Sequence, residues 1–373
     1  MPDFELQYPL IQPAEGSFRL LELPPDLCKF VESSLDSYIP LNLTIKGGAD
    51  DDAVLCTADK TYSIRSVVLS NSVLVVTPVS EEGDDSIDTR KIAIQESLHE
   101  ILELVPTVPK LHRLGGLLRG MEWDDGHEDD EFDDDSQKIK RRRFTYEQAR
   151  MELQASEQEL VKALKDRHIL VIDDALRPIP PPYLHTILEL LLAHLASLTQ
   201  QHDAASVTDL TRALEYEHEV DRRVVCQVMR WFGEIDESGD IWKMDVEAVV
   251  RQIGLGILRN YKEEPIAEDV FLKKWQDAVG DTFSEAVSIS LLSGNCLVAP
   301  GPHYTYFPQA ELPIDPAARF TDLFLTRSRW KADDIAPFLS DIAVDAKDRD
   351  KLLLKYARAL TDKDGVWYTA RTR

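Results

Sequence analysis

The apolar residues of this chain change their spacing once, and that change limits what the chain can fold into. Up to about residue 105 the spacing is mostly two, as in "LNLTIKG", "TYSIR" and "KIAIQ", which is the alternation of a half-buried β-strand. After about residue 145 it becomes 3.6, as in "PPYLHTILELLLAHLASLT", which predicts a helix with one apolar stripe. Because single cores stop growing at about 250 to 300 residues, a 373-residue chain also predicts several domains.

A charge reversal lies where the spacing changes. Nine of the twelve residues from Asp124 to Asp135 are acidic, and five of the six from Lys138 to Arg143 are basic. Blocks of like charge are usually solvated, so residues 121–144 are interpreted as a disordered linker. Its basic end matches a nuclear localisation signal, which needs a short cationic cluster on a mobile segment. The residues of that predicted signal are Lys138, Lys140, Arg141, Arg142 and Arg143.

Residues 1–120 are predicted to form an antiparallel β-barrel-like domain. Gly, Asp and Ser in "KGGADDD", "TADKTY" and "SEEGDDS" supply the turns between its strands. "PPDLCKFVESS" predicts one helix in this domain, and "ESLHEILEL" indicates a second.

Residues 145–181 predict a helix-helix-strand connector. Its two helices are divided near Ala155, where Ser156 and Glu159 have the S-x-x-E spacing of a capping box. The strand is expected at "HILVI", which is a short apolar run after the second helix.

A weak internal repeat of about 64 residues follows, over 182–245, 246–309 and 310–373. Each unit is predicted to run through three helices, the third being "EHEVDRRVVCQVMRWFG", "FSEAVSISLLSGN" or "DAKDRDKLLLKYARAL", and then a β-hairpin. This is the plan of a winged helix, whose third helix can enter a DNA major groove. The expected fold class is therefore α+β and multidomain, with a β-barrel-like domain followed by tandem winged-helix domains.

The three repeats differ in charge, and this bears on which of them can touch DNA. The chain carries a formal net charge of -25, so a nucleic-acid contact needs a local basic patch. Residues 182–245 hold five bases and twelve acids, 246–309 hold five and eight, and 310–373 hold twelve and eleven. The last repeat therefore supplies the DNA-binding candidates, which lie on its expected third helix and at the end of its wing. They are Lys347, Arg349, Lys351, Lys355, Arg358, Arg371 and Arg373.

The sequence carries no catalytic motif. It lacks G-x-x-x-x-G-K-[ST], H-E-x-x-H and G-x-S-x-G, and its four cysteines lie far apart without zinc-ligand spacing. His185 and His194, on the Leu-rich helix, are interpreted as ordinary helix histidines. No run of 18 apolar residues occurs, so no membrane span is expected. We expect no catalytic residue, no cofactor and no metal.

Four stretches of the chain resemble one known family. They are "AVLCTADKTYSIRSVVLSNSVLVV", "QASEQELVKALKDRHILVI", "RFTDLFLTRSRWKADDIAPFL" and "LLLKYARALTDKDGVWYTAR". Together they are similar to the sister chromatid cohesion proteins of the DCC family, which are subunits of an alternative, cohesion-specific replication factor C-like clamp loader. The resemblance covers nearly the whole chain in the right order, with the acidic run as its chief insertion.

The resemblance implies a non-catalytic adaptor. In the family, the N-terminal β-domain assembles with a small partner subunit and with the C-terminal tail of the large clamp-loader subunit into a composite barrel. The C-terminal winged helices reach DNA polymerase epsilon and DNA. The complex acts on the sliding clamp in the nucleus, during DNA replication and the establishment of cohesion, and other subunits handle ATP.

Two alternatives stay open from the residues alone. One is a winged-helix transcription or chromatin factor with a β-barrel dimerisation module, which predicts a base-reading third helix. Arg222 and Arg223 are the only adjacent arginines on an expected third helix, and four acids within 215–221 oppose their entry into a groove. The other is a metal-dependent hydrolase built on the acidic run, whose carboxylates have no scaffold to fix a coordination geometry.

Overall fold

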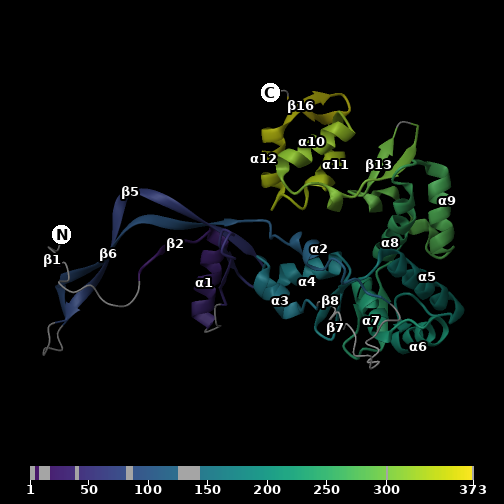
Figure 1. Ribbon diagram of the computed structural model, residues 1–373, viewed down its shortest axis with the longest axis horizontal. Helices are drawn as coiled ribbons and strands as arrows, with labels where there is room; N and C mark the ends of the chain where they lie inside the picture. The colour runs from purple at the N-terminus through teal and green to yellow at the C-terminus, as the bar shows by residue number, and fades with distance from the viewer. Residues whose placement is uncertain are drawn as a thin grey trace, which may run out of the picture. The chain divides into compact units, whose positions relative to one another are not determined.

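The computed structural model describes residues 5–7, 17–37, 42–80, 87–124, 143–299 and 301–371. They divide into two compact units, and helices and strands occur in both (Figure 1). The first unit is Met1–Pro109 together with Glu152–Glu159, and the second is Lys110–Met151 together with Leu160–Arg373. The chain therefore leaves the first unit and returns to it for a short segment.

The first unit is built on one six-stranded sheet of order β1-β6-β5-β4-β3, in which β2 also pairs with β6. Its strands are β1 (Glu5–Gln7), β2 (Leu20–Glu22), β3 (Thr44–Lys46), β4 (Val54–Cys56), β5 (Thr61–Ser80) and β6 (Ile87–Pro106). β5 and β6 form a long antiparallel ribbon, whereas β1 and β2 pair with β6 in parallel (Figure 1). Among the described residues β1 and β3 do not pair, so the sheet is open. The α+β class is confirmed, and a closed barrel is not formed by these strands.

One of the two helices expected in the first unit is present. "PPDLCKFVESS" lies in α1 (Pro25–Ser37), as predicted. The helix predicted at "ESLHEILEL" is wrong, because these residues continue β6 and pair with β5. Leu98 and Leu104 are buried and Ser97 and His99 are exposed, so the burial follows the spacing of a strand. Leu27, Leu55, Tyr62 and Leu104 form one buried apolar cluster of this unit.

The predicted capping box of Ser156 and Glu159 is confirmed. The Ser156 N–H donates to the Glu159 carboxylate (2.9 Å), and the Glu159 N–H donates to the Ser156 hydroxyl (3.3 Å). Thr61 of β5 joins this motif, since its hydroxyl donates to the same carboxylate (2.5 Å) and accepts from the Ser156 N–H (3.0 Å). These bonds fasten 152–159 to the sheet of the first unit.

The second unit begins with short elements that precede the repeats. They are α2 (Arg113–Leu117), α3 (Tyr146–Glu152), α4 (Glu157–Asp166), β7 (Ile169–Ile172) and β8 (Ala175–Pro178). The strand predicted at "HILVI" is confirmed as β7, which forms a hairpin with β8. Asp173 and Asp174 form its two-residue turn with φ of 50° and 62°, the left-handed conformation that matches the twist of a hairpin.

The remaining chain repeats one order of elements three times. In each case a short strand between the first two helices pairs with the second strand of the hairpin, in the orders β10-β11-β9, β12-β14-β13 and β15-β17-β16. The first repeat contains α5 (Pro181–Ser197), β9 (Ala205–Ser206), α6 (Val207–His218), α7 (Arg222–Trp231), β10 (Gly233–Ile235) and β11 (Ile241–Met244). The second contains α8 (Val246–Leu258), η1 (Arg259–Tyr261), β12 (Ile266–Ala267), α9 (Glu268–Val279), η2 (Ser284–Ala286), η3 (Ile289–Leu292), β13 (Cys296–Ala299) and β14 (His303–Tyr306). The third contains η4 (Gln309–Glu311), α10 (Pro316–Thr326), β15 (Arg329–Lys331), α11 (Ala332–Ile335), η5 (Ala336–Leu339), α12 (Ala346–Tyr356), β16 (Ala357–Asp362) and β17 (Gly365–Ala370).

Each repeat buries one tryptophan completely. The indole N–H groups of Trp242, Trp275 and Trp330 each donate to a backbone carbonyl, at 2.8, 2.8 and 2.9 Å. The first two repeats share one apolar core, and the third has a core of its own.

Two details of the predicted repeats are wrong. "FSEAVSISLLSGN" forms only the short 3₁₀ segments η2 and η3, because its serine hydroxyls bond locally and compete with a helix. Ser284, for example, donates to the Asp281 carbonyl (2.9 Å), and the Ser288 and Ser290 hydroxyls lie 2.8 Å apart. Arg358, predicted on the third helix of the last repeat, lies in β16, which begins at Ala357 and pairs with β17.

Candidate functional site

Five apolar side chains of β5 are exposed, and they form what we call the β5 surface. Its residues are Val67, Val68, Val73, Leu74 and Val76. Val67 and Val68 are neighbours and therefore point to opposite faces of the strand, yet they are 39% and 81% exposed. The described part of this chain thus covers neither face of the ribbon at this position.

The outer edge of β5 is also open along most of its length. β4 pairs with β5 only at Thr61, Tyr62 and Ser63, and the Ile64 N–H then donates to the Ala53 carbonyl (3.3 Å). Beyond Ile64 no strand among the described residues pairs with this edge. An edge of unpaired N–H and C=O groups beside exposed apolar side chains is suited to accept a strand from a partner protein.

An ion pair connects α1 to the strands beside it. The Lys60 ammonium donates to the Asp26 carboxylate (2.7 Å), and the Tyr62 hydroxyl lies 3.3 Å from the same oxygen. The hydrogen bond with Lys60 lowers the pKa of Asp26, and the same bond raises the pKa of Lys60. Both groups are about half exposed, so this pair orients α1 more than it stabilises the unit.

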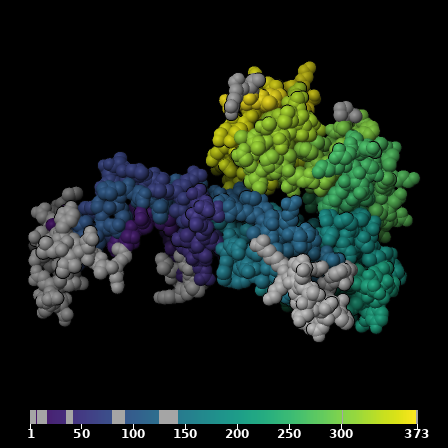
Figure 2. Space-filling view, viewed as in Figure 1, coloured from purple at the N-terminus to yellow at the C-terminus, as the bar shows by residue number. Residues whose placement is uncertain are grey.

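Four of the DNA-binding candidates are exposed on the third repeat, the yellow part of Figure 2. Lys347, Lys351 and Lys355 are spaced four apart on α12 and share one face of it, while Leu353 points into the core. Arg358 follows at the start of β16. The structure therefore brings these four cationic groups onto the surface of one helix and the adjoining strand.

The other DNA-binding candidates are placed differently. Arg349 is half-buried and contacts Asp350 (3.4 Å). Arg371 donates to the carbonyls of Leu354 (2.9 Å) and Lys355 (3.2 Å), where it satisfies the C-terminal end of α12. Its guanidinium is thus held by the fold. Arg373 lies outside the described residues.

Arg329 was missed by the sequence reasoning. It lies in β15 opposite Thr369, and Thr369 in turn lies opposite Arg358 of β16, so both arginines occupy one row of the sheet. Arg329 pairs with Asp362 and stacks over Trp367, 4.3 Å from the ring centroid. Only the strand register reveals this neighbour, because 29 positions separate the two arginines in the chain.

The predicted nuclear localisation signal lies almost wholly outside the described residues. Lys138, Lys140, Arg141 and Arg142 are in the part of the chain that is not described, and Arg143 is described and exposed. The acidic run from Asp124 to Asp135 is likewise described only at Asp124.

Two carboxylates bind one of the two adjacent arginines of α7. Arg223 contacts both Asp221 (2.6 Å) and Asp173 (3.1 Å). Burial alone would raise the pKa of the Asp221 carboxyl, but its hydrogen bonds with Arg223 together outweigh burial and lower that pKa. A guanidinium paired with two carboxylates is a poor candidate for reading a base, which weakens the transcription-factor alternative.

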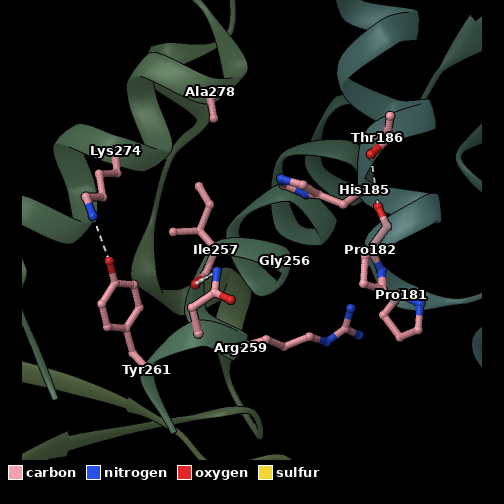
Figure 3. Close-up of a pocket in the computed structure, with 11 residues that line it drawn as sticks. Pro181, Pro182, His185, Thr186, Gly256, Ile257, Arg259, Tyr261, Lys274 and Ala278 are labelled. Atoms are coloured by element: carbon pink, nitrogen blue, oxygen red, sulfur yellow. Dashed lines mark hydrogen bonds between the residues drawn. The ribbon is translucent and has the colours of Figure 1, made fainter. Parts of the chain in front are cut away.

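The second unit contains a cavity of about 510 Å³ beside α5, α8, η1 and α9 (Figure 3). Its lining includes three basic residues and no acid: His185, Arg259 and Lys274. The Lys274 ammonium donates to the Tyr261 hydroxyl (2.7 Å), and the buried Nδ1 atom of His185 has no partner among the described residues. The lining favours an anionic group over a cation. Sequence reasoning did not find this cavity, because its residues come from four separate elements.

No helix among the described residues has both the length and the apolar character needed to cross a membrane.

The model of one protein family, sister chromatid cohesion protein Dcc1, matches residues 18–339. Proteins described as sister chromatid cohesion protein DCC1 are similar along nearly their whole length. The Xenopus tropicalis protein is 28% identical over 95% of this chain and 90% of its own, and the Homo sapiens protein is 27% identical over 96% and 89%. The Saccharomyces cerevisiae protein is 25% identical over 92% and 94%. This chain therefore belongs to the Dcc1 family of sister chromatid cohesion proteins.

Proposed function

We propose that this protein is a non-catalytic adaptor subunit of an alternative, replication factor C-like clamp loader. In this role it links the loader to DNA polymerase epsilon and to DNA in the nucleus, and it supports sliding-clamp loading, DNA replication and sister chromatid cohesion. Family membership supports the role in cohesion. The observation that carries the adaptor role is the β5 surface together with the open edge of β5.

The first unit is the anchor in this proposal. A two-stranded ribbon is only marginally stable in water. Apolar side chains exposed on both of its faces destabilise it further in the isolated chain, and such patches are typical of surfaces that bind a partner. Strands from the small partner subunit and from the C-terminal tail of the large subunit would pair with the β5 edge and cover its apolar faces. The open sheet would then become part of a composite barrel, which leaves no free edge.

The second unit is the arm that reaches the polymerase and DNA. Its first and third repeats have the element order of winged helices, with 3₁₀ segments in place of the third helix in the second repeat, and such modules dock proteins as well as DNA. In an acidic chain, the exposed lysines of α12 are the best place for a contact with phosphate. The first two repeats are more acidic and are assigned to protein partners.

A charge placed on the β5 surface tests the anchor. The full-length chain with Val68→Glu is co-expressed with the two partner subunits, and we expect the complex to be lost on affinity purification, since burying an unpaired carboxylate is costly. Val161→Glu is the matched control, because Val161 is an exposed valine of α4, 52% accessible. If Val68→Glu co-purifies as well as the control does, β5 is not the anchoring surface.

A further inference from the structure

Two histidines and a glutamate from different helices converge in the first repeat. His194 lies in α5, and Glu217 and His218 end α6. The Nε2 atoms of the two imidazoles lie 3.2 Å apart, and the Glu217 carboxylate is 3.9 Å from the His194 Nε2 atom. One nitrogen or oxygen of each residue falls within 4.8 Å of the others. His194 is buried, whereas Glu217 and His218 are exposed.

These distances fit the ligand shell of a zinc ion. A tetrahedral zinc with Zn–N bonds of about 2.0 to 2.1 Å separates two imidazole nitrogens by about 3.3 Å, which is close to the observed spacing. The Glu217 carboxylate, 3.9 Å from the His194 Nε2 atom, has to move closer to the nitrogens, and its side chain is 65% exposed. A hydrogen bond between the two imidazoles fits the same spacing, and zinc titration distinguishes it from metal binding.

We propose that His194, Glu217 and His218 bind one zinc ion, with water at the fourth position. Two imidazoles and one carboxylate are a ligand set that zinc accepts, whereas Ca²⁺ and Mg²⁺ require a shell of oxygens. The exposed side of the cluster gives the ion a path of entry. The bound ion ties the C-terminal turn of α5 to that of α6. It therefore cross-links the first two helices of the repeat near their C-terminal ends.

The site lies outside the expectation drawn from the sequence, in which His194 was an ordinary helix histidine. His194 and His218 are separated by 24 positions, so no local sequence motif predicts the site. It is also independent of the adaptor proposal, since neither β5 nor α12 contributes a residue.

Zinc titration of the full-length chain tests the proposal. The chain is stripped with a chelator, and zinc is added in an isothermal calorimeter at neutral pH. We expect one zinc per chain for the native protein and at least a tenfold lower affinity for His218→Ala, whose side chain is exposed and leaves the fold intact. Glu217→Gln keeps the size of the side chain and removes its charge, so its affinity should also fall. His99→Ala is the control, because His99 is an exposed imidazole of β6 and should leave the binding unchanged.

A thermal melt gives a second readout. Zinc should raise the melting temperature of the native protein and of His99→Ala, and should raise that of His218→Ala much less. Magnesium at the same concentration should have no effect. The proposal is overturned if the native chain binds no stoichiometric zinc, if His218→Ala binds zinc as tightly as the native chain, or if magnesium has the same effect as zinc.

Discussion

His168, a partly buried side chain, makes the stability of the second unit depend on pH in the acid range. It follows α4 with a φ of 52°, and its ring packs against Trp231 (5.4 Å) and Phe232 (5.3 Å, nearly parallel). Burial, with smaller contributions from the charges of Arg259 and Arg251, lowers the pKa of His168 from 6.5 to about 4. The ring is therefore neutral in the folded protein at pH 7, where it packs as an aromatic group.

The sign and size of the effect follow from these two pKa values. Between pH 6.5 and pH 4 the unfolded chain binds a proton at this ring that the folded chain does not, so the free energy of unfolding falls as the pH falls. The loss begins as the pH drops through about 6.5 and is complete below about 4. Its ceiling is roughly 3 kcal/mol, from about 1.36 kcal/mol per pKa unit, and roughly 2 kcal/mol of it is lost between pH 7 and pH 5.

Urea unfolding at pH 7 and pH 5 measures this loss. All six tryptophans lie in the second unit, so their fluorescence reports on that unit alone. The comparison is with His168→Asn, because asparagine tolerates a left-handed backbone and does not titrate. All other ionisable groups are the same in both proteins, so their contributions cancel in this comparison. We expect the native protein to lose about 2 kcal/mol more than the variant. Equal losses would refute the reasoning.

Two further predictions concern the third repeat. Changing Lys347, Lys351 and Lys355 to Glu together should weaken DNA binding and lower its salt dependence by about one slope unit for each lost phosphate contact, with Lys162→Glu as an exposed control on α4. Unchanged affinity and slope would place the DNA contact elsewhere. Arg319 is fully buried, pairs with Asp341, and donates to the Pro313 (2.6 Å) and Phe338 (2.9 Å) carbonyls. Arg319→Met should lower the free energy of unfolding in urea by about 3 kcal/mol, because it leaves these acceptors without a donor. Arg212→Met changes an exposed arginine and is the control. An equal loss in the two variants would contradict the prediction.

Local signals in the sequence predicted local structure well. The S-x-x-E spacing found the capping box at Ser156 because both partners lie within one turn. The error at "ESLHEILEL" has a physical cause, since Leu98, Ile101 and Leu102 also fit a helical spacing, and only pairing with β5 decides for the strand. Contacts between residues far apart in the sequence could not be predicted. No sequence pattern shows that Arg371 caps α12 or that His194 meets His218, because in each case the tertiary fold brings the two together.

The contrast between the two units supports the proposal that strands of partner proteins cover the first unit. Each repeat of the second unit fills a core around a fully buried tryptophan whose indole N–H is bonded. The first unit contains the longest strands among the described residues, and five apolar side chains of β5 are exposed. A ribbon of two 20-residue strands with exposed apolar side chains is unfavourable in an isolated chain. Its apolar side chains and the unpaired backbone groups of its edge stay in water. The same ribbon becomes favourable once other strands cover it, which is why charge at Val68 should break assembly and leave the second unit folded.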